Sequence, residues 1–469
     1  MADRLYIDFE SYSACDIKKR GGLAYARHPS TNMLCMGYAF DDEPAELLKG
    51  IYALPGRIKD HVGEGKPIYA HNAGFDYRIW NIVCTAQLDW PVLSLNQMVD
   101  TAALCLSFQV PPSLADAGAA LNISLPKSPD GKRLIKICCT PGKNGEQPMP
   151  TGPMSAYFER LFAYCKRDVE AMRQVVKALP REYLIPQEQY LWELTYEMNT
   201  LGLPVDHEAI KAIHSHLATY IATETANIPK LCNNFFQTPG QVAKIKEWCG
   251  LQGYPMEAMT AEKVGLALED PKCPDHVRRV LEMRQELGRS SVAKFTKLLD
   301  FALKGKDGLH YVHDNMQYHG AGTGRWSGRS FQMHNLPRAS VPNPDELIMQ
   351  FVNGEYVHDP VKTAKALIRP MVRANVNELL VVSDYSSIEN RVLHWLAGDF
   401  DTLEDFKNGI DQYKTMASAR YQVAYDMVTK EQRQMGKVII LGCGYGMGGD
   451  TFQETAKVQF GMDVSLVEA

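Results

Sequence analysis

The chain has 469 residues, of which 45% are hydrophobic and 22% are charged, a composition typical of a globular protein of two to three domains. No apolar run approaches the roughly 20 residues that cross a bilayer, and the N-terminus lacks the basic and apolar pattern of a secretory signal, so a membrane protein is excluded. The net charge of −5 favours no class of partner. The eleven cysteines form no C-x-x-C pair, so neither a disulfide framework nor a zinc ribbon is expected.

The first 180 residues show a mixed α/β pattern. Three short apolar runs and one long amphipathic stretch predict strands over 5–9, 32–40 and 68–70 and a helix over 155–179. Pro180 and Pro186 then mark a boundary, because proline tends to end a helix just before it. We therefore expect the first domain to span residues 1–180.

The rest of the chain divides into a helical part and a second mixed part. The pattern of residues 187–305 predicts mostly helices, and we expect a helical domain over 181–310. The third expected domain, 311–469, has a mixed pattern, with a strand predicted at 379–384 and a helix with an apolar face at 431–441.

Two carboxylates stand at the end of the first predicted strand. Asp8 and Glu10 are two residues apart, so on a strand they point to the same face. Carboxylates aimed at one point repel unless a divalent cation neutralises them, which makes this strand end a candidate metal site. The plainer alternative is an exposed strand end with solvated acids.

Two more groups of polar residues follow in the same domain. Asn72 and Asp76 come after the strand at 68–70 and open a helical stretch, while Asp100 is a weaker candidate for a supporting role. Tyr164 and Asp168 are four residues apart, so the phenol and the carboxylate share one face of the long helix.

Four acids and a tyrosine on these elements suit phosphodiester hydrolysis by two Mg²⁺ (or Mn²⁺) ions, with the tyrosine orienting the attacking water. The arrangement resembles the tyrosine-bearing subclass of the DEDD 3′–5′ exonuclease family. The resemblance implies a ribonuclease H-like fold for residues 1–180, with Asn72 near the substrate and Tyr164 in a catalytic role. It implies that the metal ligands are Asp8, Glu10, Asp76 and Asp168.

A second set of motifs lies in the C-terminal third of the chain. Two of them are 319–327 (HGAGTGRWS) and 381–391 (VVSDYSSIENR), and the third, in 433–446, has the pattern R-x₃-K-x₇-Y-G. These resemble the T-G-R signature, motif A and motif B of family A DNA polymerases, most of all the compact phage type. The two resemblances cover nearly the whole chain. They imply an α/β exonuclease domain, a helical thumb, and a partial α+β palm with fingers.

The family pattern implies a role for each matched residue. Arg433 and Lys437 are one helical turn apart, so both can meet a triphosphate. The remaining implied roles are metal binding by Asp384 and the carbonyl of Tyr385, selection of deoxyribose by Glu389, stacking at the nascent base pair by Tyr445 with Gly446, and contact with the primer end by Arg325.

A basic stretch over 271–297 holds seven Lys and Arg residues against three acids. In a helical thumb it would grip duplex phosphates through Arg284, Ser291 and Lys294. The alternative is a solvated helix face.

Three departures from the polymerase pattern are present. Leu441 stands where the family usually has an aromatic ring, and His334 replaces a glutamine. No His-Asp-Glu follows Gly446, and the pairs His313-Asp314 and His358-Asp359 both precede motif A. We therefore expect an incomplete palm that needs further chain, such as a second polypeptide, before it polymerises.

The reading that best fits these motifs is a proofreading DNA polymerase that takes primer-template DNA and dNTPs in DNA replication, with a phage origin and the host bacterial cytoplasm as its location. Two alternatives stay open. The chain is a stand-alone 3′–5′ exonuclease with a DNA-binding polymerase remnant, or it is the non-catalytic half of a split polymerase.

Overall fold

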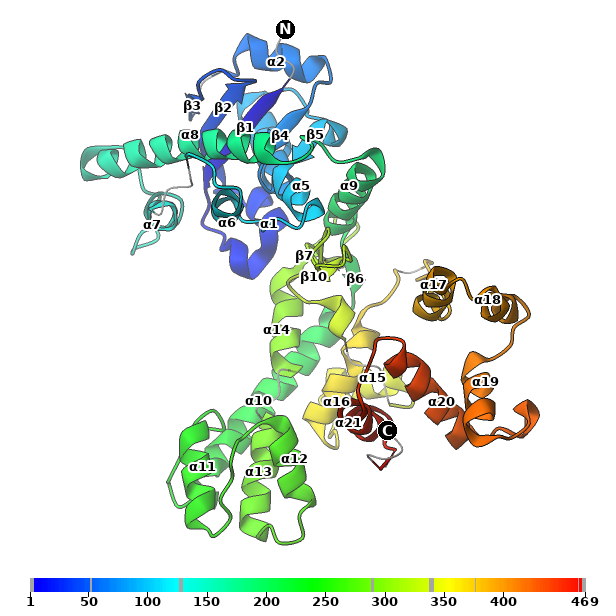
Figure 1. The fold of residues 1–469 in the computed structure, drawn as a ribbon. Helices are drawn as coiled ribbons and strands as arrows, with labels where there is room; N and C mark the ends of the chain where they lie inside the picture. Colours follow the sequence, from blue (N-terminus) through cyan, green and yellow to red (C-terminus); the bar gives the residue numbers. More distant parts are fainter. Residues whose placement is uncertain are drawn as a thin grey trace. The chain divides into compact units, whose positions relative to one another are not determined.

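The computed structural model describes residues 4–50, 53–125, 130–287, 291–336, 341–375, 377–462 and 464–465. They belong to two compact units, Met1–Leu379 and Leu380–Ala469, and each is described by itself (Figure 1). In the described part of the chain, no helix combines the length and apolar character that crossing a membrane requires.

The N-terminal part of the first unit contains a five-stranded sheet with the order β3-β2-β1-β4-β5. Its strands are β1 (Leu5–Tyr12), β2 (Asn32–Phe40), β3 (Glu46–Lys49), β4 (Ile68–Ala70) and β5 (Met98–Asp100). β1 lies in the centre, antiparallel to β2 and parallel to β4, which is parallel to β5. The three predicted strands are confirmed, and the parallel strands β1 and β4 end at the same edge of the sheet.

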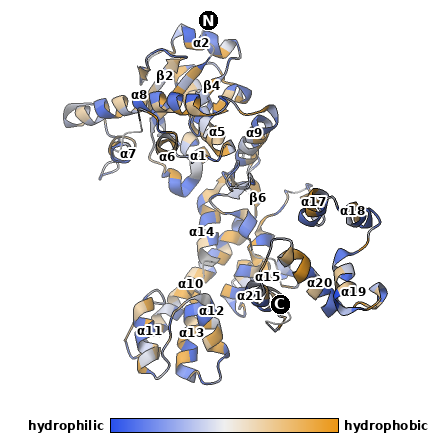
Figure 2. Ribbon diagram, viewed as in Figure 1, coloured by the Kyte–Doolittle hydropathy of each residue, from blue (hydrophilic) through white to orange (hydrophobic). Residues whose placement is uncertain are grey.

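Helices surround this sheet in the mixed α/β pattern that the sequence predicts. They are α1 (Ile17–Arg27), α2 (Gly56–Gly63), α3 (Ala73–Arg78), the π-helical turn η1 (Ile79–Cys84), α4 (Thr85–Leu88), η2 (Leu95–Gln97), α5 (Thr101–Ser107), α6 (Leu114–Ala120), α7 (Gly131–Cys138), η3 (Gly152–Met154) and α8 (Ser155–Ala178). The long predicted helix is α8, which packs against β1 and β2. Hydrophobic and hydrophilic residues alternate along it, as expected for a helix that buries one side (Figure 2).

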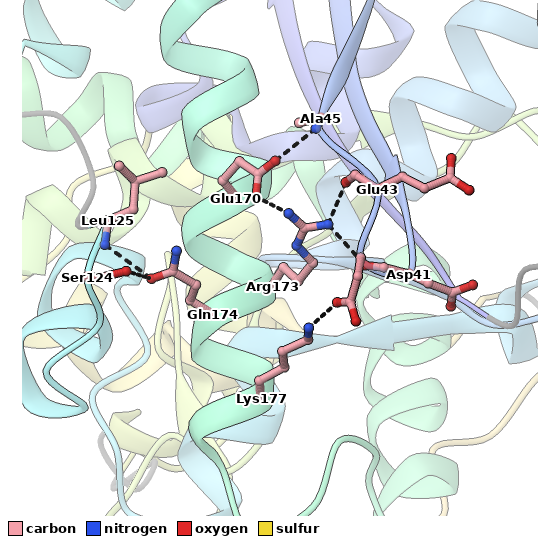
Figure 3. Close-up of polar contacts among 10 residues, drawn as sticks. Asp41, Glu43, Ala45, Ser124, Leu125, Glu170, Arg173, Gln174 and Lys177 are labelled. Carbon is pink, nitrogen blue, oxygen red and sulfur yellow. Dashed lines mark hydrogen bonds and ion pairs between the residues drawn. The ribbon is translucent and has the colours of Figure 1, made fainter.

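Polar contacts fix the C-terminal half of α8 to its surroundings (Figure 3). The Arg173 guanidinium donates to the backbone carbonyls of Asp41 and Glu43, at 3.0 and 2.6 Å, and pairs with Glu170. Glu170 in turn accepts a hydrogen bond from the Ala45 amide at 2.8 Å. These contacts attach α8 to the β2–β3 turn, so the inner face of the helix has a fixed position over the sheet.

Most of the remaining first unit is helical, which confirms the pattern predicted for 187–305. Its helices are α9 (Pro186–Leu201), α10 (His207–Leu231), α11 (Val242–Leu251), α12 (Ala261–Glu269), α13 (Asp275–Leu287), α14 (Ser291–Phe301), η4 (Met333–Asn335), α15 (Pro344–Asn353), α16 (Pro360–Leu367) and η5 (Arg369–Met371). A small sheet has the order β6-β8-β7, with β6 (Leu203–Val205), β7 (Ala302–Lys304) and β8 (His310–Val312). β9 (Met316–Gln317) and β10 (Ser327–Gly328) pair as a hairpin.

The regular secondary structure in the described residues of the second unit is helical. They form α17 (Ile388–Ala397), α18 (Phe400–Lys407), α19 (Gln412–Tyr421), η6 (Tyr425–Met427), α20 (Lys430–Cys443) and α21 (Gly449–Phe460). The predicted helix at 431–441 is confirmed within α20. Gly436 allows α20 to approach α19 closely, because a Cβ there would lie only 3.1 Å from the carbonyl carbon of Tyr413.

The strand predicted at 379–384 is wrong. These residues have no regular secondary structure, and Leu379, Val381 and Val382 are each about 90% exposed. Alternating apolar residues form a strand only when a neighbouring strand accepts their backbone hydrogen bonds. No such strand pairs with them in the described ranges.

We expect Arg173→Ala to weaken the attachment of α8 by about 1–3 kcal/mol, because two backbone carbonyls lose a charged donor. Amide hydrogen exchange of 41–49 and of α8 measures the effect. Lys166→Ala, which removes an exposed cation from the same helix, is the matched control. Equal exchange in the two variants would show that the Arg173 contacts contribute nothing.

Candidate active sites

The first candidate site lies where β1 meets α3. Asp8 and Glu10 occupy alternate positions on one face of the central strand, and Glu10 is buried. The Phe9 amide between them donates to Asp76 Oδ1 at 3.2 Å. Asp76 is in the first turn of α3, which begins just after β4. The parallel pairing of β1 and β4 therefore brings these three acids to one sheet edge.

Asp76 is almost completely buried, at 3% exposure. Burial, followed by the negative charge of Asp8, raises the pKa of Asp76 well above its usual range. The structure thus places two carboxylates, Asp8 and Asp76, next to each other where solvent does not screen their repulsion. This electrostatic cost is the one that a bound cation relieves.

The turn before α3 is held by Asp100, at the end of β5. Asn72 has a left-handed backbone with φ 67°, and its amide donates to Asp100 Oδ1 at 3.0 Å. The other carboxylate oxygen of Asp100 accepts from Trp192 Nε1 at 2.9 Å. Asp100 therefore has a structural supporting role, since it fixes the turn that presents Asn72.

Tyr164 and Asp168 share the buried inner face of α8. Burial raises the pKa of Tyr164, and the charges of Asp168, Glu10 and Asp8 raise it further. The phenol thus lies within electrostatic range of three of the four acids. It stays protonated at neutral pH and is a hydrogen-bond donor there.

Several residues that support this site were missed by sequence reasoning. Cys139 Sγ donates to Glu10 Oε2 at 3.7 Å, and Cys165 Sγ donates to the Asp8 carbonyl at 3.3 Å. Burial raises the pKa of both thiols, so they remain protonated donors. Gly131, the first residue of α7, faces Tyr164, and a Cβ there would lie 2.7 Å from the phenol oxygen. No local motif signals these contacts, because each joins residues distant in sequence.

The donor set fits a divalent cation in chemistry. Carboxylate oxygens are the ligands that Mg²⁺ prefers, and burial, followed by the charge of Asp8, already disfavours the charged form of Asp76. Among the residues that the structure describes, no three histidine, cysteine or carboxylate side chains already stand close enough to hold a metal ion.

The T-G-R residues lie in the connection between β9 and β10. The Ala321 amide donates to the Arg325 carbonyl at 3.1 Å, and Gly324, at φ +82°, donates to the Ala321 carbonyl at 2.9 Å. Trp326 Nε1 donates to Thr195 Oγ1 on α9 at 2.7 Å. This tight turn leaves the Arg325 side chain exposed.

The motif A and motif B residues lie in the second unit. Asp384 and Tyr385 are exposed on the segment before α17, and Glu389 is exposed in the first turn of that helix. Arg433 and Lys437 lie one turn apart on α20. In the turn after α20, Tyr445 is 70% exposed and Gly446 has φ +69°.

Arg433 has a partner that the sequence did not reveal. Its Nε lies 2.6 Å from Asp411 Oδ2, and its guanidinium lies over the Tyr413 ring at 5.2 Å. Asp411 also accepts a hydrogen bond from the Tyr413 amide at the start of α19. The ion pair therefore sets the direction of the Arg433 side chain.

The three residues suggested for DNA contact have different surroundings. Arg284 donates to the carbonyls of Pro239 and Met259, at 2.8 and 3.1 Å, so it joins two loops of the helical region. Lys294 donates to the Asn335 carbonyl at 2.8 Å. Burial, and then the nearby charges of Lys297 and Lys365, lower the pKa of Lys294. The side chain of Ser291 lies outside the described residues.

We expect Gly131→Ala to destabilise the first unit by about 1–3 kcal/mol, because the new methyl group overlaps the Tyr164 ring. Urea unfolding measures the loss. Gly56→Ala is the matched control, since Gly56 also begins a helix and has nothing within 4 Å of its added Cβ. Equal unfolding midpoints would contradict the close approach.

The raised pKa of Asp76 predicts a pH dependence of stability. The folded chain binds a proton on this carboxyl more tightly than the unfolded chain, so stability falls as pH rises from the usual aspartate range through the raised pKa. In a chelator we expect Asp76→Asn to lose less stability than wild type as pH rises above about 4, the usual aspartate range. Parallel pH profiles for this variant and wild type would contradict it, and Asp116→Asn, at an exposed position on α6, is the control.

Comparison with known proteins agrees with this arrangement of motifs. The sequence model of DNA polymerase family A matches residues 209–462, more than half of the chain. The DNA polymerase of Bacillus phage SP02 is 29% identical over 98% of this chain and 72% of its own length. DNA polymerase I of Chloroflexus aurantiacus is 24% identical over 81% of this chain, and the match spans only 38% of that longer protein.

The fold agrees as well. The POL domain of Pol1 from M. smegmatis, solved in complex with DNA primer-template and dNTP, is similar with a TM-score of 0.60 and 16% sequence identity. The similarity covers 100% of this chain and 71% of that one. From the family match and the motifs together, the chain belongs to DNA polymerase family A.

Proposed function

We propose that the chain is a DNA-templated DNA polymerase with a 3′–5′ proofreading exonuclease in its first 180 residues, acting on primer-template DNA and dNTPs. Family membership supports the polymerase part. One observation carries the exonuclease part: the charges of Asp8, Glu10 and Asp168 converge on the buried phenol of Tyr164. A proofreading site needs this combination of acids and a protonated donor.

For the exonuclease we propose that Asp8, Glu10, Asp76 and Asp168 hold two Mg²⁺ or Mn²⁺ ions. Such ions, when bound, activate water and stabilise the leaving oxygen of the phosphodiester. The Tyr164 phenol donates a hydrogen bond that orients the attacking water. Asn72, presented on its left-handed turn, contacts the DNA strand end. This arrangement corresponds to a ribonuclease H-like domain.

For polymerisation we propose that Asp384 and the carbonyl of Tyr385 bind the catalytic metals and that Glu389 limits space at the sugar 2′ position. On α20, two further side chains, Arg433 and Lys437, bind the triphosphate, since they lie one turn apart on the same helix. This requires Arg433 to exchange its ion pair with Asp411 for one with the triphosphate, which carries more negative charge than a single carboxylate.

DNA is held, in this proposal, by three exposed or basic features. Tyr445, next to Gly446, stacks at the nascent base pair, and Arg325 contacts the primer end from the β9–β10 turn. Lys294 meets duplex phosphates together with its neighbours Lys297 and Lys365, whose mutual repulsion an anion would relieve. Arg284 is less suited to this role, because its guanidinium already bonds two carbonyls.

The hydrophobic clusters bear differently on the proposed domain boundaries. One cluster of buried residues is centred on the five-stranded sheet, others lie in the helical region, and another joins α20 and α21. The core of the sheet supports an exonuclease domain over 1–180. One cluster joins buried residues from 205–302 with buried residues from 312–371, so it spans the boundary proposed between a thumb over 181–310 and a palm with fingers over 311–469.

A primer-extension gel tests both activities. With Mg²⁺ and a 5′-labelled primer on a template, we expect trimming without dNTPs, loss of trimming in Asp8→Ala, and a fall of at least about 10²-fold in Tyr164→Phe. With dNTPs added, extension of the primer measures the proposed polymerase site. Any extension is expected to disappear in Asp384→Asn and to persist in Asp401→Asn, an exposed control on α18.

Trimming that survives in Asp8→Ala would overturn the exonuclease proposal. Extension that survives in Asp384→Asn would overturn the polymerase assignment of that residue.

A further inference from the structure

We propose that Asp314, a residue of the polymerase-family region, is a positioning residue for the exonuclease, because it fixes Arg78 and through it the short helix that carries Asp76. This inference rests on the proposed exonuclease function. It also gives a role to one of the two His-Asp pairs that match no polymerase motif.

The contact is a buried ion pair. Arg78 is the last residue of α3, two positions after Asp76, and its Nη2 lies 2.7 Å from Asp314 Oδ1, with the two side chains only 7% and 20% exposed. The Asp314 Oδ2 atom accepts a hydrogen bond from the Leu23 amide of α1 at 3.2 Å. One carboxylate thus joins two helices of the N-terminal domain.

Two glycines make room for this pair. Gly21 has φ +84°, a backbone conformation that interrupts α1, and a Cβ on it would lie 2.9 Å from Asp314 Oδ2. A Cβ on Gly22 would lie 2.9 Å from Arg78 Nη1. A Gly-Gly pair inside a helix is unfavourable by itself. Its presence here is explained by the space that it leaves for the side chains of Arg78 and Asp314.

Asp314 is itself held firmly on the polymerase side. It lies between β8 and β9, and its amide donates to the Asn199 carbonyl on α9 at 3.2 Å. Asn199 also exchanges two side-chain hydrogen bonds with the Met316 backbone, at 2.7 and 2.9 Å. Because β9 pairs with β10, the carboxylate is rigidly connected to the hairpin that carries Arg325.

The ion pair borders a cavity, so it contributes to the position of α3. A cavity of about 460 Å³ is lined by Asn72, Arg78, Asp314 and Arg329, among others. Elsewhere α3 packs through Tyr77 against Tyr196, and at the end of the helix that borders the cavity the ion pair holds Arg78 in place. Burial alone would lower the pKa of Arg78, yet Asp314 and Tyr196 raise it overall, and loss of one partner leaves a buried charge.

The test uses the full chain with a 5′-labelled single-stranded oligonucleotide, Mg²⁺ and single-turnover conditions. We expect Asp314→Asn to slow trimming by about 10- to 100-fold with little change in the DNA concentration for half-maximal rate, because misplacement of a catalytic group lowers the rate rather than binding. Asp116→Asn, with the same loss of charge on an exposed helix, should trim like wild type.

A double-variant cycle separates positioning from general damage. If Asp314 acts through Arg78, the double variant of Arg78→Gln and Asp314→Asn loses about as much rate as Asp314→Asn alone, instead of the product of both losses. Amide exchange of residues 73–84 should accelerate in Asp314→Asn and not in Asp116→Asn. Should Asp314→Asn fail to fold, Gly22→Ala, which pushes on Arg78 and keeps both charges, should show the same slowing and exchange.

Wild-type trimming rates in Asp314→Asn, or multiplicative losses in the double variant, would overturn the inference. A wild-type chain that trims no faster than Asp8→Ala would instead overturn the proposed exonuclease. In that case the exchange of residues 73–84 still decides whether Asp314 holds α3, so the two failures are distinguishable.

Discussion

The concentration of negative charge at the end of β1 is the constraint on which the first site depends. Four acids reach this place from three elements, and three of them, Glu10, Asp76 and Asp168, are buried. The surrounding chain compensates with donors: the Phe9 amide on Asp76, the Cys139 thiol on Glu10, and the phenol of Tyr164, which stays protonated. Arg173 and its carbonyl partners keep α8 in place on the opposite side. The fold thus tolerates repulsion at one sheet edge because these donors contact the acids and the Arg173 contacts hold α8 in place.

The polymerase motifs are arranged differently. Residues 209–462 match the family, and this range begins in the first turn of α10, after all four acids of the first site. The exonuclease proposal therefore rests on local geometry, whereas the polymerase assignment rests on similarity to the family. The motif side chains Arg325, Tyr385 and Tyr445 are exposed, as expected for groups that contact an absent partner. Arg433 differs, because Asp411 already neutralises it.

The sequence alone was sufficient where spacing along one element decides the geometry. Asp8 with Glu10 on a strand, and Tyr164 with Asp168 on a helix, follow from periodicity, and so do β1, β2, β4, α8 and α20. It was insufficient where a distant partner decides. The segment 379–384 has the apolar pattern of a strand and no strand beside it in the described ranges. Arg284 has the charge of a phosphate ligand, yet it bonds Pro239 and Met259. Cys139 has no motif at all, because its relation to Glu10 exists only in three dimensions.

The space that Gly21 and Gly22 leave for the ion pair has a consequence for evolution and engineering. Domains with their own cores can in general be recombined at the linkers that join them. Here the N-terminal domain leaves space for a carboxylate that the other part of the chain supplies, and a Cβ on Gly21 or Gly22 would lie 2.9 Å from the ion pair. A chimera that combines this N-terminal domain with a foreign polymerase would leave Arg78 without its counter-charge unless an acid were present at the position of Asp314. The two glycines therefore restrict which domain combinations remain compatible.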